Sequence, residues 1–419
     1  VFKGIDLSKV EPNTINYGHI VAFVSCQIID EVLVSIFKAP KSYTKEDVVE
    51  INCHGGLFVT NKIYEQLVLL GARPSEPGEF TKRAFLSGRI DLTKAEAVMD
   101  VINAENSAAL KIANSALNGK ISTFVDQKRQ ELLDIIATIS VNIDYPEYDD
   151  VEQLTNEDIL PKLKTIKLEL EDVLNNAKSA KLLKNGINTV IVGKPNVGKS
   201  SLLNTLIGEN KAIVTNIPGT TRDIVEASIN LGQVTLNLID TAGIRITEDV
   251  VEKIGVEKSK EQINKADIIL CVLDGSEPIN EQDKEILNEI KNKCHLTIIN
   301  KIDLEQKINL GEVDDNVLFI STKNNNTIKE LENKILETLN LNNLFNKDIT
   351  YISNARQLEK INFAIKALDE ALTTIENEAT IDFVDIDIRK AWLYLGEIVG
   401  QTSTDNLLDE LFSKFCLGK

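Results

Sequence analysis

Short runs of alternating apolar and polar residues occupy the first part of the chain. Glu31–Ser35 and Val48–Ile51 have the alternation of half-buried β-strands. Turn signals separate such runs, among them Cys53–Gly56 and Pro74–Glu79. Residues 1–85 are therefore predicted to form a small α+β domain.

A helical spacing of apolar residues follows. A first repeat covers 117–139, and Pro161 opens a second amphipathic stretch that stops near Gly186. Residues 86–186 are predicted to be the first segment of a helical domain. The repeating residues are Leu117, Ile121, Phe124, Leu132, Ile135 and Ile139, then Leu163, Ile166, Leu170, Val173 and Ala177.

From Asn188 the pattern changes to apolar, strand-like runs separated by helical stretches. That alternation is typical of a parallel sheet with crossover helices, so residues 187–342 are predicted to form an α/β domain. From about Tyr351 the chain is helical again, and residues 343–419 are predicted to complete the helical domain. The α/β domain is thus expected as an insertion between two helical segments. The strand-like runs are Thr189–Val192, Leu236–Ile239, Ile268–Leu273, Leu296–Ile299 and Val317–Ile320.

The composition is that of a globular protein with more than one domain. The 419 residues are 43% apolar and 26% charged, which excludes a largely disordered or collagen-like chain. Lys and Arg number 46 and Asp and Glu number 64, so the formal net charge is −18. A general nucleic-acid coat or a membrane-surface binder would have the opposite sign. Any nucleic-acid contact is therefore expected at a local basic patch.

The cysteines indicate a reducing compartment. They are odd in number, widely spaced and without a CxxC pair, which argues against a disulfide framework and a structural zinc site. Cys26, Cys53, Cys271 and Cys294 lie in apolar or strand-like contexts and are expected in the core. No apolar run approaches the ~18 residues of a membrane helix and no signal peptide is visible, so a cytoplasmic protein is expected. The chain begins at Val1 without an initiator Met, and some N-terminal sequence is expected to be missing.

Gly193–Ser200 reads GKPNVGKS and fits the pattern GxxxxGK[ST]. It follows an expected strand and precedes an expected helix, which is the context of a phosphate-binding loop. Glycines let backbone N–H groups turn toward phosphates, and the helix N-terminus adds its positive end. Lys199 is expected to reach the β- and γ-phosphates, and Ser200 to ligate Mg²⁺.

Three further segments follow strands, at the edge where open α/β sheets bind ligands. Asp240–Gly243 reads DTAG, in which an Asp can hold the water of Mg²⁺ and a Gly N–H can sense the γ-phosphate. In Asn300–Asp303, the Asp303 carboxylate can accept from the guanine N1–H and N2–H₂, a pair of donors that adenine lacks. Ser321–Lys323 lies where a backbone N–H can meet the guanine O6. The order and spacing resemble the translation-factor-related GTPases, and the base is expected to be guanine.

The residue after the DTAG glycine is Ile244, where many small GTPases have a glutamine that orients the attacking water. Water orientation is therefore expected from another group. Asn196 places a side-chain oxygen beside the phosphates, and a monovalent cation held there could replace an arginine finger. Asn196 is equally well explained as a turn former, and the spacing alone does not separate these two interpretations.

Selective runs at both ends of the chain extend the resemblance. They are Val49–Gly56 (VEINCHGG), Pro77–Phe80 (PGEF), Gly219–Asp223 (GTTRD), Ile254–Val256 (IGV) and the terminal Phe415–Lys419 (FCLGK). Together with the phosphate loop, they make the whole chain similar to the MnmE family of tRNA-modification GTPases.

The resemblance implies an α+β tetrahydrofolate-binding, dimer-forming domain, a split helical domain and an inserted P-loop G domain. It implies a homodimer that works with the flavoprotein MnmG, as a heterotetramer, to add an aminomethyl-type group to carbon 5 of the wobble uridine in certain tRNAs. The implied cofactors are GTP, Mg²⁺, K⁺ and a tetrahydrofolate derivative, 5-formyl or 5,10-methylene. Potassium-dependent pairing of the G domains is expected to activate hydrolysis.

Motif matches transfer the roles of the family to particular residues. Glu252 is expected to orient the hydrolytic water indirectly, with Lys199 and Cys416 as further catalytic candidates. The implied ligands of K⁺ are Asn196, Thr215, Ile217 and Thr220, those of Mg²⁺ are Ser200 and Thr221, and the folate contacts are Glu50, Arg89 and Lys419. The GTP-binding set is Asn196, Val197, Gly198, Lys199, Ser200, Ser201, Thr215, Asn216, Ile217, Pro218, Gly219, Thr220, Thr221, Asp240, Thr241, Ala242, Gly243, Asn300, Lys301, Asp303, Ser321, Thr322 and Lys323.

Some alternatives stay open at this stage. Cys416 is either a reactive thiol or a small packed hydrophobe. The apolar segment Ala22–Gln27 has no assigned role. A GTP-driven assembly factor, or a GTP-sensing scaffold without a direct role in the chemistry, would share the G domain. The FCLGK terminus and the N-terminal domain favour the modification enzyme over an assembly factor.

Overall fold

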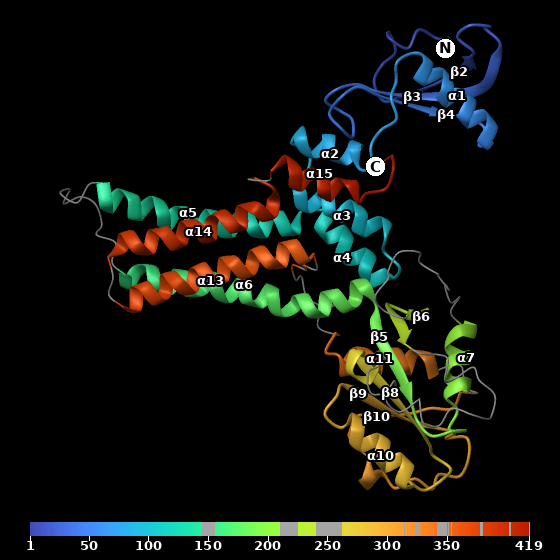
Figure 1. The fold of residues 1–419 in the computed structure, drawn as a ribbon, viewed down its shortest axis with the longest axis vertical. Helices are drawn as coiled ribbons and strands as arrows, with labels where there is room; N and C mark the ends of the chain where they lie inside the picture. The colour runs from blue at the N-terminus through green and yellow to red at the C-terminus, as the bar shows by residue number, and fades with distance from the viewer. Residues whose placement is uncertain are drawn as a thin grey trace. The chain divides into compact units, whose positions relative to one another are not determined.

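The computed structural model describes most of the chain (Figure 1). Within it, two compact units are Val1–Met99 with Leu395–Lys419, and Asp100–Tyr394. The bounds of the four predicted segments stay a prediction. The described residues are 1–144, 156–209, 225–239, 262–313, 315–322, 327–341, 350, 352, 354–377, 380–401 and 404–418.

The first unit contains an antiparallel sheet in the order β1-β2-β3-β4, as predicted for an α+β domain. Val32, Val34 and Ile36 alternate along β3 and are buried in one apolar cluster with Ile63 of α1. The alternation of apolar and polar residues in β3 therefore corresponds to one buried face of the strand. The elements are β1 (Phe2–Gly4), β2 (Thr14–Val21), β3 (Ile28–Phe37), β4 (Val48–Asn52), α1 (Leu57–Leu69), α2 (Glu79–Leu86), α3 (Leu92–Ile102) and α15 (Asp405–Ser413).

The apolar segment 22–27 forms the turn between β2 and β3. The N–H of Ala22 donates to the carbonyl of Gln27 at 2.8 Å, and Cys26 has a φ of 53°. Phe23 and Val24 are exposed there. The apolar sequence of this segment therefore does not indicate burial, because no other element among the described residues packs over the tight turn at Phe23 and Val24.

Long helices from both sides of the α/β domain pack together, which confirms the split helical domain (Figure 1). The Nζ of Lys167 on α6 lies 2.5 Å from Asp369 Oδ1 on α13. On α5, the guanidinium of Arg129 lies 4.2 Å from the ring centre of Trp392 on α14. The helices are α4 (Ser107–Leu117), α5 (Lys120–Asp144), α6 (Asn156–Asn185), α13 (Ala355–Glu376) and α14 (Ile381–Val399).

The inserted domain is built on a six-stranded sheet in the order β10-β9-β8-β5-β7-β6, parallel except for β6 against β7. Every residue of the central strand β8 is buried, as expected of a parallel strand covered on both faces. All five strand-like runs are strands, which confirms the α/β prediction. The elements are β5 (Ile187–Val192), α7 (Lys199–Glu209), β6 (Val225–Leu231), β7 (Val234–Ile239), β8 (Ile268–Asp274), α10 (Glu281–Ile290), β9 (His295–Asn300), a 3₁₀ turn (Leu310–Glu312), β10 (Val317–Phe319) and α11 (Thr327–Thr338).

Two local predictions need correction. Pro161 does not open its helix but lies inside α6. Among the cysteines expected in the core, only Cys271 is buried, where burial raises the pKa of its thiol to about 12. Cys26 and Cys294 are exposed, because one lies in a tight turn and the other directly precedes β9. No helix among the described residues is long and apolar enough to cross a membrane.

Candidate nucleotide site

The phosphate loop leaves β5 at the carboxyl edge of the sheet and enters α7 at Lys199. Its two glycines are required by space as well as by backbone angle. Gly193 has a φ of 149°, and a Cβ there would lie 2.3 Å from the carbonyl oxygen of Val272. Gly198 has a φ of 101°, and a Cβ there would lie 2.1 Å from the Nδ2 of Asn300. The loop therefore leaves no room for a side chain at either glycine.

Lys199 lies under the loop with its ammonium on two backbone carbonyls. Its Nζ donates to the oxygens of Gly193 at 2.6 Å and of Lys194 at 2.7 Å. Burial lowers the pKa of this ammonium, because the charged form loses water. A desolvated cation at a helix N-terminus is well suited to bind an anion. Ser200 and Ser201 follow on the first turn of α7 and are exposed.

Asn196 lies at the tip of the loop with a φ of 65°, and its side chain is exposed. A left-handed conformation of this kind is tolerated by asparagine, which confirms that Asn196 acts as a turn former. The geometry leaves its potassium role a prediction.

The Asn300–Asp303 loop is hydrogen-bonded to the phosphate loop through a buried side-chain amide. Asn300, 1% exposed, donates from Nδ2 to the carbonyl of Val197 at 2.9 Å. Its Oδ1 is also buried and has no hydrogen-bond partner among the described residues. The two loops were predicted from motifs that are far apart in the sequence. They are in contact because Gly198 has no side chain, which leaves space for the Asn300 amide.

Asp303 and Ser321 are brought together, as the motif assignment expected. The hydroxyl of Ser321 donates to Asp303 Oδ1 at 2.9 Å. Thr322 follows Ser321, and its carbonyl accepts from Thr205 of α7 at 3.4 Å. Lys301 has a φ of 64° and pairs with Asp274 Oδ2 at 2.5 Å. This pairing orients the turn that carries Asp303.

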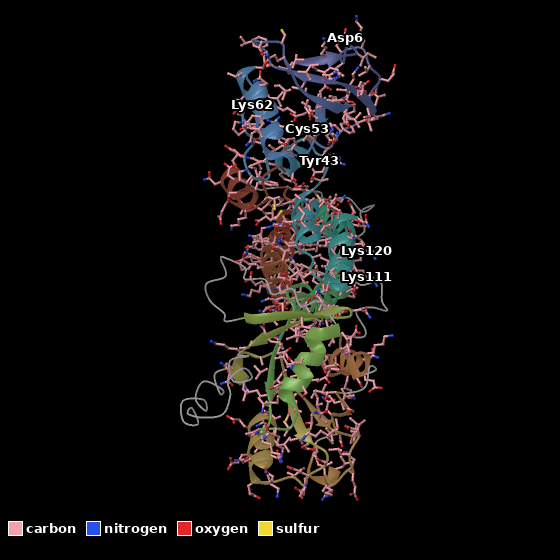
Figure 2. The ribbon with its side chains drawn as sticks, turned by 90° about the vertical axis from the view of Figure 1, so that its right-hand side faces the viewer. Asp6, Tyr43, Cys53, Lys62, Lys111 and Lys120 are labelled. Atoms are coloured by element: carbon pink, nitrogen blue, oxygen red, sulfur yellow. The ribbon has the colours of Figure 1, made fainter. Side chains whose placement is uncertain are left out.

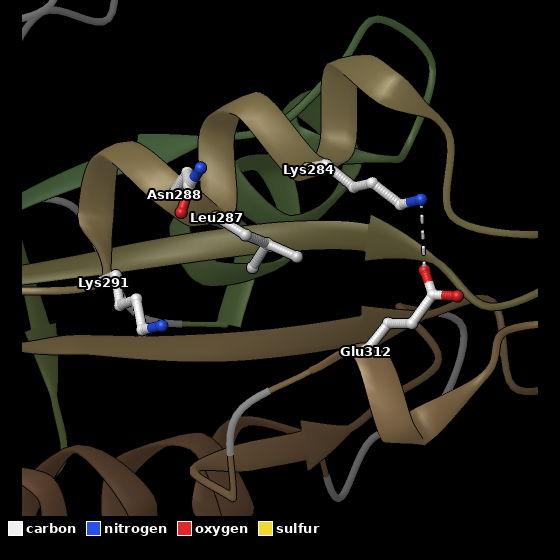
Figure 3. A pocket seen from close by; sticks show the side chains of 5 residues that line it. All are labelled: Lys284, Leu287, Asn288, Lys291 and Glu312. Atoms are coloured by element: carbon white, nitrogen blue, oxygen red, sulfur yellow. Dashed lines mark ion pairs between the residues drawn. The ribbon is translucent and has the colours of Figure 1, made fainter.

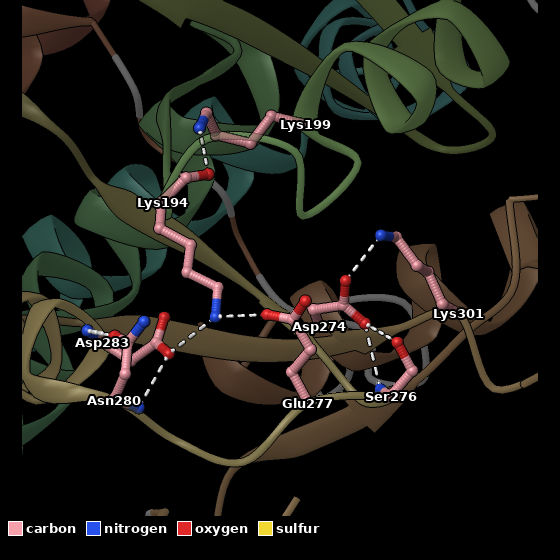
Figure 4. Close-up of polar contacts among 8 residues, drawn as sticks. All are labelled: Lys194, Lys199, Asp274, Ser276, Glu277, Asn280, Asp283 and Lys301. Carbon is pink, nitrogen blue, oxygen red and sulfur yellow. Dashed lines mark hydrogen bonds and ion pairs between the residues drawn. The ribbon is translucent and has the colours of Figure 1, made fainter. Parts of the chain in front are cut away.

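Sequence reasoning missed three charged residues of the site. Asp274, at the end of β8, accepts from Lys301 and Ser276, and these bonds lower the pKa of its carboxyl although burial opposes them. Lys194 and Asp283 form an ion pair beneath the phosphate loop (Figure 4). Asp274 could have been found from the sequence, because it stands at the end of a predicted strand. The pairing of Lys194 with Asp283 could not, because the two residues are far apart in the sequence.

Several predicted site residues lie outside the described residues. For the switches these are Thr215, Asn216, Ile217, Pro218, Gly219, Thr220, Thr221, Asp240, Thr241, Ala242, Gly243 and Glu252. Lys323 and Lys419 also lie outside them.

A second set of predicted residues belongs to the first unit. The N–H of Gly78, in the PGEF run, donates to the carbonyl of Cys416 at 3.2 Å. A Cβ on Gly78 would lie 2.7 Å from the carbonyl oxygen of Phe412, so the PGEF run packs tightly against the C-terminal segment. Cys416 itself is exposed, which contradicts its alternative interpretation as a packed hydrophobe.

The two remaining folate candidates also lie in the first unit. Glu50 is exposed on β4, and the Arg89 guanidinium lies 4.8 Å from the ring centre of Tyr43. Figure 2 labels Tyr43 and Cys53 in this unit.

A hollow on the outer face of α10 is not part of the nucleotide site. It is lined by Lys284, Leu287, Asn288, Lys291 and Glu312 (Figure 3). Its residues come from α10 and the 3₁₀ turn, and none is a motif residue.

The residues at the sheet edge fit a nucleoside triphosphate. Gly193 and Gly198 give the loop a backbone shape that a side chain would block, Lys199 is a partly buried cation at the helix N-terminus, and the buried Oδ1 of Asn300 has no hydrogen-bond partner among the described residues. A phosphate loop hydrogen-bonded to the Asn300–Asp303 loop at the edge of a parallel sheet makes this protein a P-loop GTPase.

Comparison with known proteins identifies the family within the P-loop GTPases. Residues 2–89 match the family model "GTP-binding protein TrmE N-terminus", and residues 92–416 match "MnmE helical domain". The tRNA modification GTPase MnmE of Bacillus cytotoxicus is 48% identical, over 100% of this chain and 93% of its own length. That of Streptococcus thermophilus is 49% identical, over 100% and 92%. The chain belongs to the MnmE family of tRNA modification GTPases.

Several solved structures are similar to part of the chain, among them Era and a FeoB G domain. Era of Aquifex aeolicus is 31% identical over 43% of this chain and 66% of its own, with a TM-score of 0.28. The G domain of the T. maritima FeoB iron transporter is 27% identical over 36% of this chain and 98% of its own, with a TM-score of 0.27.

Proposed function

We propose that this protein is a potassium-dependent GTPase that modifies tRNA together with the flavoprotein MnmG. The product is an aminomethyl-type group on carbon 5 of the wobble uridine. The observation that carries the proposal is the full-length likeness to proteins named tRNA modification GTPase MnmE. The acting form is a homodimer in the cytoplasm, joined with MnmG in a heterotetramer.

The nucleotide half of the proposal rests on the geometry of the phosphate loop. Lys199 would neutralise the β- and γ-phosphates, and Ser200 with Thr221 would hold Mg²⁺, which stabilises charge that develops on the phosphates. Asp303 would select guanine while Ser321 fixes its carboxylate. Val197 and Asn300 are buried beneath the loop and support its backbone.

The potassium dependence is inferred from Ile244, which stands where many small GTPases have a water-orienting glutamine. Ile244 has no polar atom with which to orient water, so another arrangement must supply this role. A monovalent cation beside the phosphates would find a neutral oxygen on Asn196, which lies in an exposed turn. Thr215, Ile217 and Thr220 would complete its ligands, and Glu252 would position the water from the second switch.

The folate half of the proposal rests on the first unit. Glu50 would accept from the donor-rich pterin, while Arg89 and Lys419 would meet the carboxylates of the glutamate tail. Two observations support it. The Arg89 guanidinium lies against the Tyr43 ring, and Gly78 of the PGEF run contacts the backbone of Phe412 and Cys416. Cys416 is an exposed thiol in that same segment.

GTP turnover at equal ionic strength in potassium and in sodium tests the hydrolytic half. We expect turnover to rise strongly in potassium. Glu252→Ala should bind GTP and dimerise in potassium but lose most of the turnover, whereas Asn196→Ala should lose the potassium response. Asn288→Ala is the matched control, because Asn288 is an exposed asparagine on the outer face of α10.

The outcomes separate the proposal from its alternatives. Equal rates in both salts, or a fully active Glu252→Ala protein, would show that the hydrolytic mechanism is wrong even though the fold is right. A GTP-driven assembly factor or a scaffold would show the same nucleotide kinetics, so those alternatives are tested on tRNA, by mass spectrometry of wobble uridines in a strain that lacks the gene.

A further inference from the structure

Lys194 occupies the second position of the phosphate loop and faces two ways (Figure 4). Its backbone carbonyl accepts from the ammonium of Lys199 at 2.7 Å. Its own ammonium lies 3.2 Å from Asp283 Oδ2 and 3.0 Å from Glu277 Oε2. One residue therefore connects the phosphate-contacting lysine to a helix that makes no predicted contact with nucleotide.

Burial makes this connection different from an ordinary surface ion pair. The side chain of Lys194 is 10% exposed and that of Asp283 is 4% exposed, whereas Glu277 is 59% exposed. Buried partners are weakly screened by solvent and by salt. The pair of Lys194 with Asp283 should therefore dominate, and Glu277 should add little.

Asp283 is itself fixed in place by the N-terminus of α10. Its Oδ2 accepts from the N–H of Asn280 at 3.2 Å, and its N–H donates to Asn280 Oδ1 at 3.0 Å, which is a reciprocal capping box. Its Oδ1 is buried without a hydrogen-bond partner among the described residues. The carboxylate depends on Lys194 for compensation of its charge, and the capping box keeps it from moving to solvent.

We propose that Lys194 is a positioning residue of the nucleotide site. Its buried ion pair with Asp283 holds the carbonyls on which Lys199 rests, and so sets how long bound nucleotide is retained. The inference rests on the proposed nucleotide site and adds to it a residue that does not touch nucleotide. Loss of the pair would let the loop shift, and Lys199 would then meet the phosphates in a broader range of positions.

Dissociation of a fluorescent GDP analogue from the full-length protein is the test. Lys194→Met keeps the aliphatic stem and removes the charge, and should speed dissociation roughly tenfold, equivalent to ~1.4 kcal/mol. Asp283→Asn keeps the volume and the capping oxygen, and should do the same. Lys194→Arg should restore retention, because the cation is kept. Lys284→Met is the matched control, since Lys284 is a half-exposed lysine of α10 that lies 3.7 Å from Glu312 (Figure 3).

The double variant Lys194→Met/Asp283→Asn decides whether the two residues act as one unit. Coupled residues give about the tenfold effect of either single change, whereas independent residues multiply to about a hundredfold. Parent-like dissociation from Lys194→Met, or a multiplied effect in the double variant, would overturn the proposal. If Lys194→Met fails to fold, Asp283→Asn carries the test, and parent-like dissociation from it would overturn the proposal too.

Lys199→Ala separates this inference from the proposed nucleotide site. Retention of nucleotide by Lys199→Ala would refute the site itself, and the positioning role with it. Loss of nucleotide by Lys199→Ala with parent-like behaviour of Lys194→Met would refute the positioning role alone.

Discussion

Replacing Asp303 by asparagine removes a charge at the point where we propose that the base is selected. In the structure, Asp303 Oδ1 accepts from the Ser321 hydroxyl at 2.9 Å, so the carboxylate is oriented before nucleotide binds. Asparagine keeps one acceptor oxygen but puts an NH₂ donor in place of the other. One hydrogen bond to a charged group is lost, about 1.5–3 kcal/mol, so the affinity for GTP should fall roughly 10- to 150-fold.

Isothermal titration with GTP measures this loss, and a second nucleotide tests its cause. Xanthine has a carbonyl where guanine has its amino group, so the amide of Asp303→Asn should bind xanthosine triphosphate better than the parent does. Asp315→Asn is the matched control, because Asp315 is an exposed aspartate of the same domain. Undiminished GTP affinity in Asp303→Asn would refute the assignment of the base loop.

Further predictions concern space, acid stability and the C-terminus. Gly198→Ala should lose nucleotide binding in the same titration, because its Cβ would lie 2.1 Å from Asn300 Nδ2; parent-like affinity would contradict the packing of the two loops. Hydrogen bonds, first of all from Arg73, lower the pKa of Glu79 from 4.5 to about 2, so its ionised form stabilises the fold above the higher value and this stabilisation is lost as the pH falls toward the lower one. Glu79→Gln should therefore flatten the pH dependence of denaturant unfolding in that window, and an unchanged slope would count against the ion pair. Calorimetry should detect binding of 5-formyl-tetrahydrofolate to the full-length protein, and unchanged affinity after removal of the last five residues would exclude Lys419 from the site.

The parallel sheet was predictable because burial on both faces makes its strands continuous apolar runs. β5, β8 and β9 each coincide with such a run. β6 was not predicted, because Val225–Leu231 is an edge strand with a mixed sequence. β2 was missed because Asn16 and Gly18, residue types that are depleted in strands, interrupt its apolar sequence.

The motif residues of the site were predictable because their local sequence fixes backbone shape. Gly198 and Asn300 are examples, since one must lack a side chain for the other to enter. The ion pair of Lys194 with Asp283 joins residues that are 89 positions apart, and only the packing of α10 against the sheet brings them together. No local pattern could have shown it.

Mass spectrometry of wobble uridines tests the central claim most directly. tRNA would be prepared from a strain that lacks the gene, and from the same strain carrying the parent chain or Lys199→Ala. The account predicts that the modification at carbon 5 disappears without the gene, returns with the parent chain, and does not return with Lys199→Ala. Wobble uridines that stay fully modified in the strain lacking the gene would contradict it.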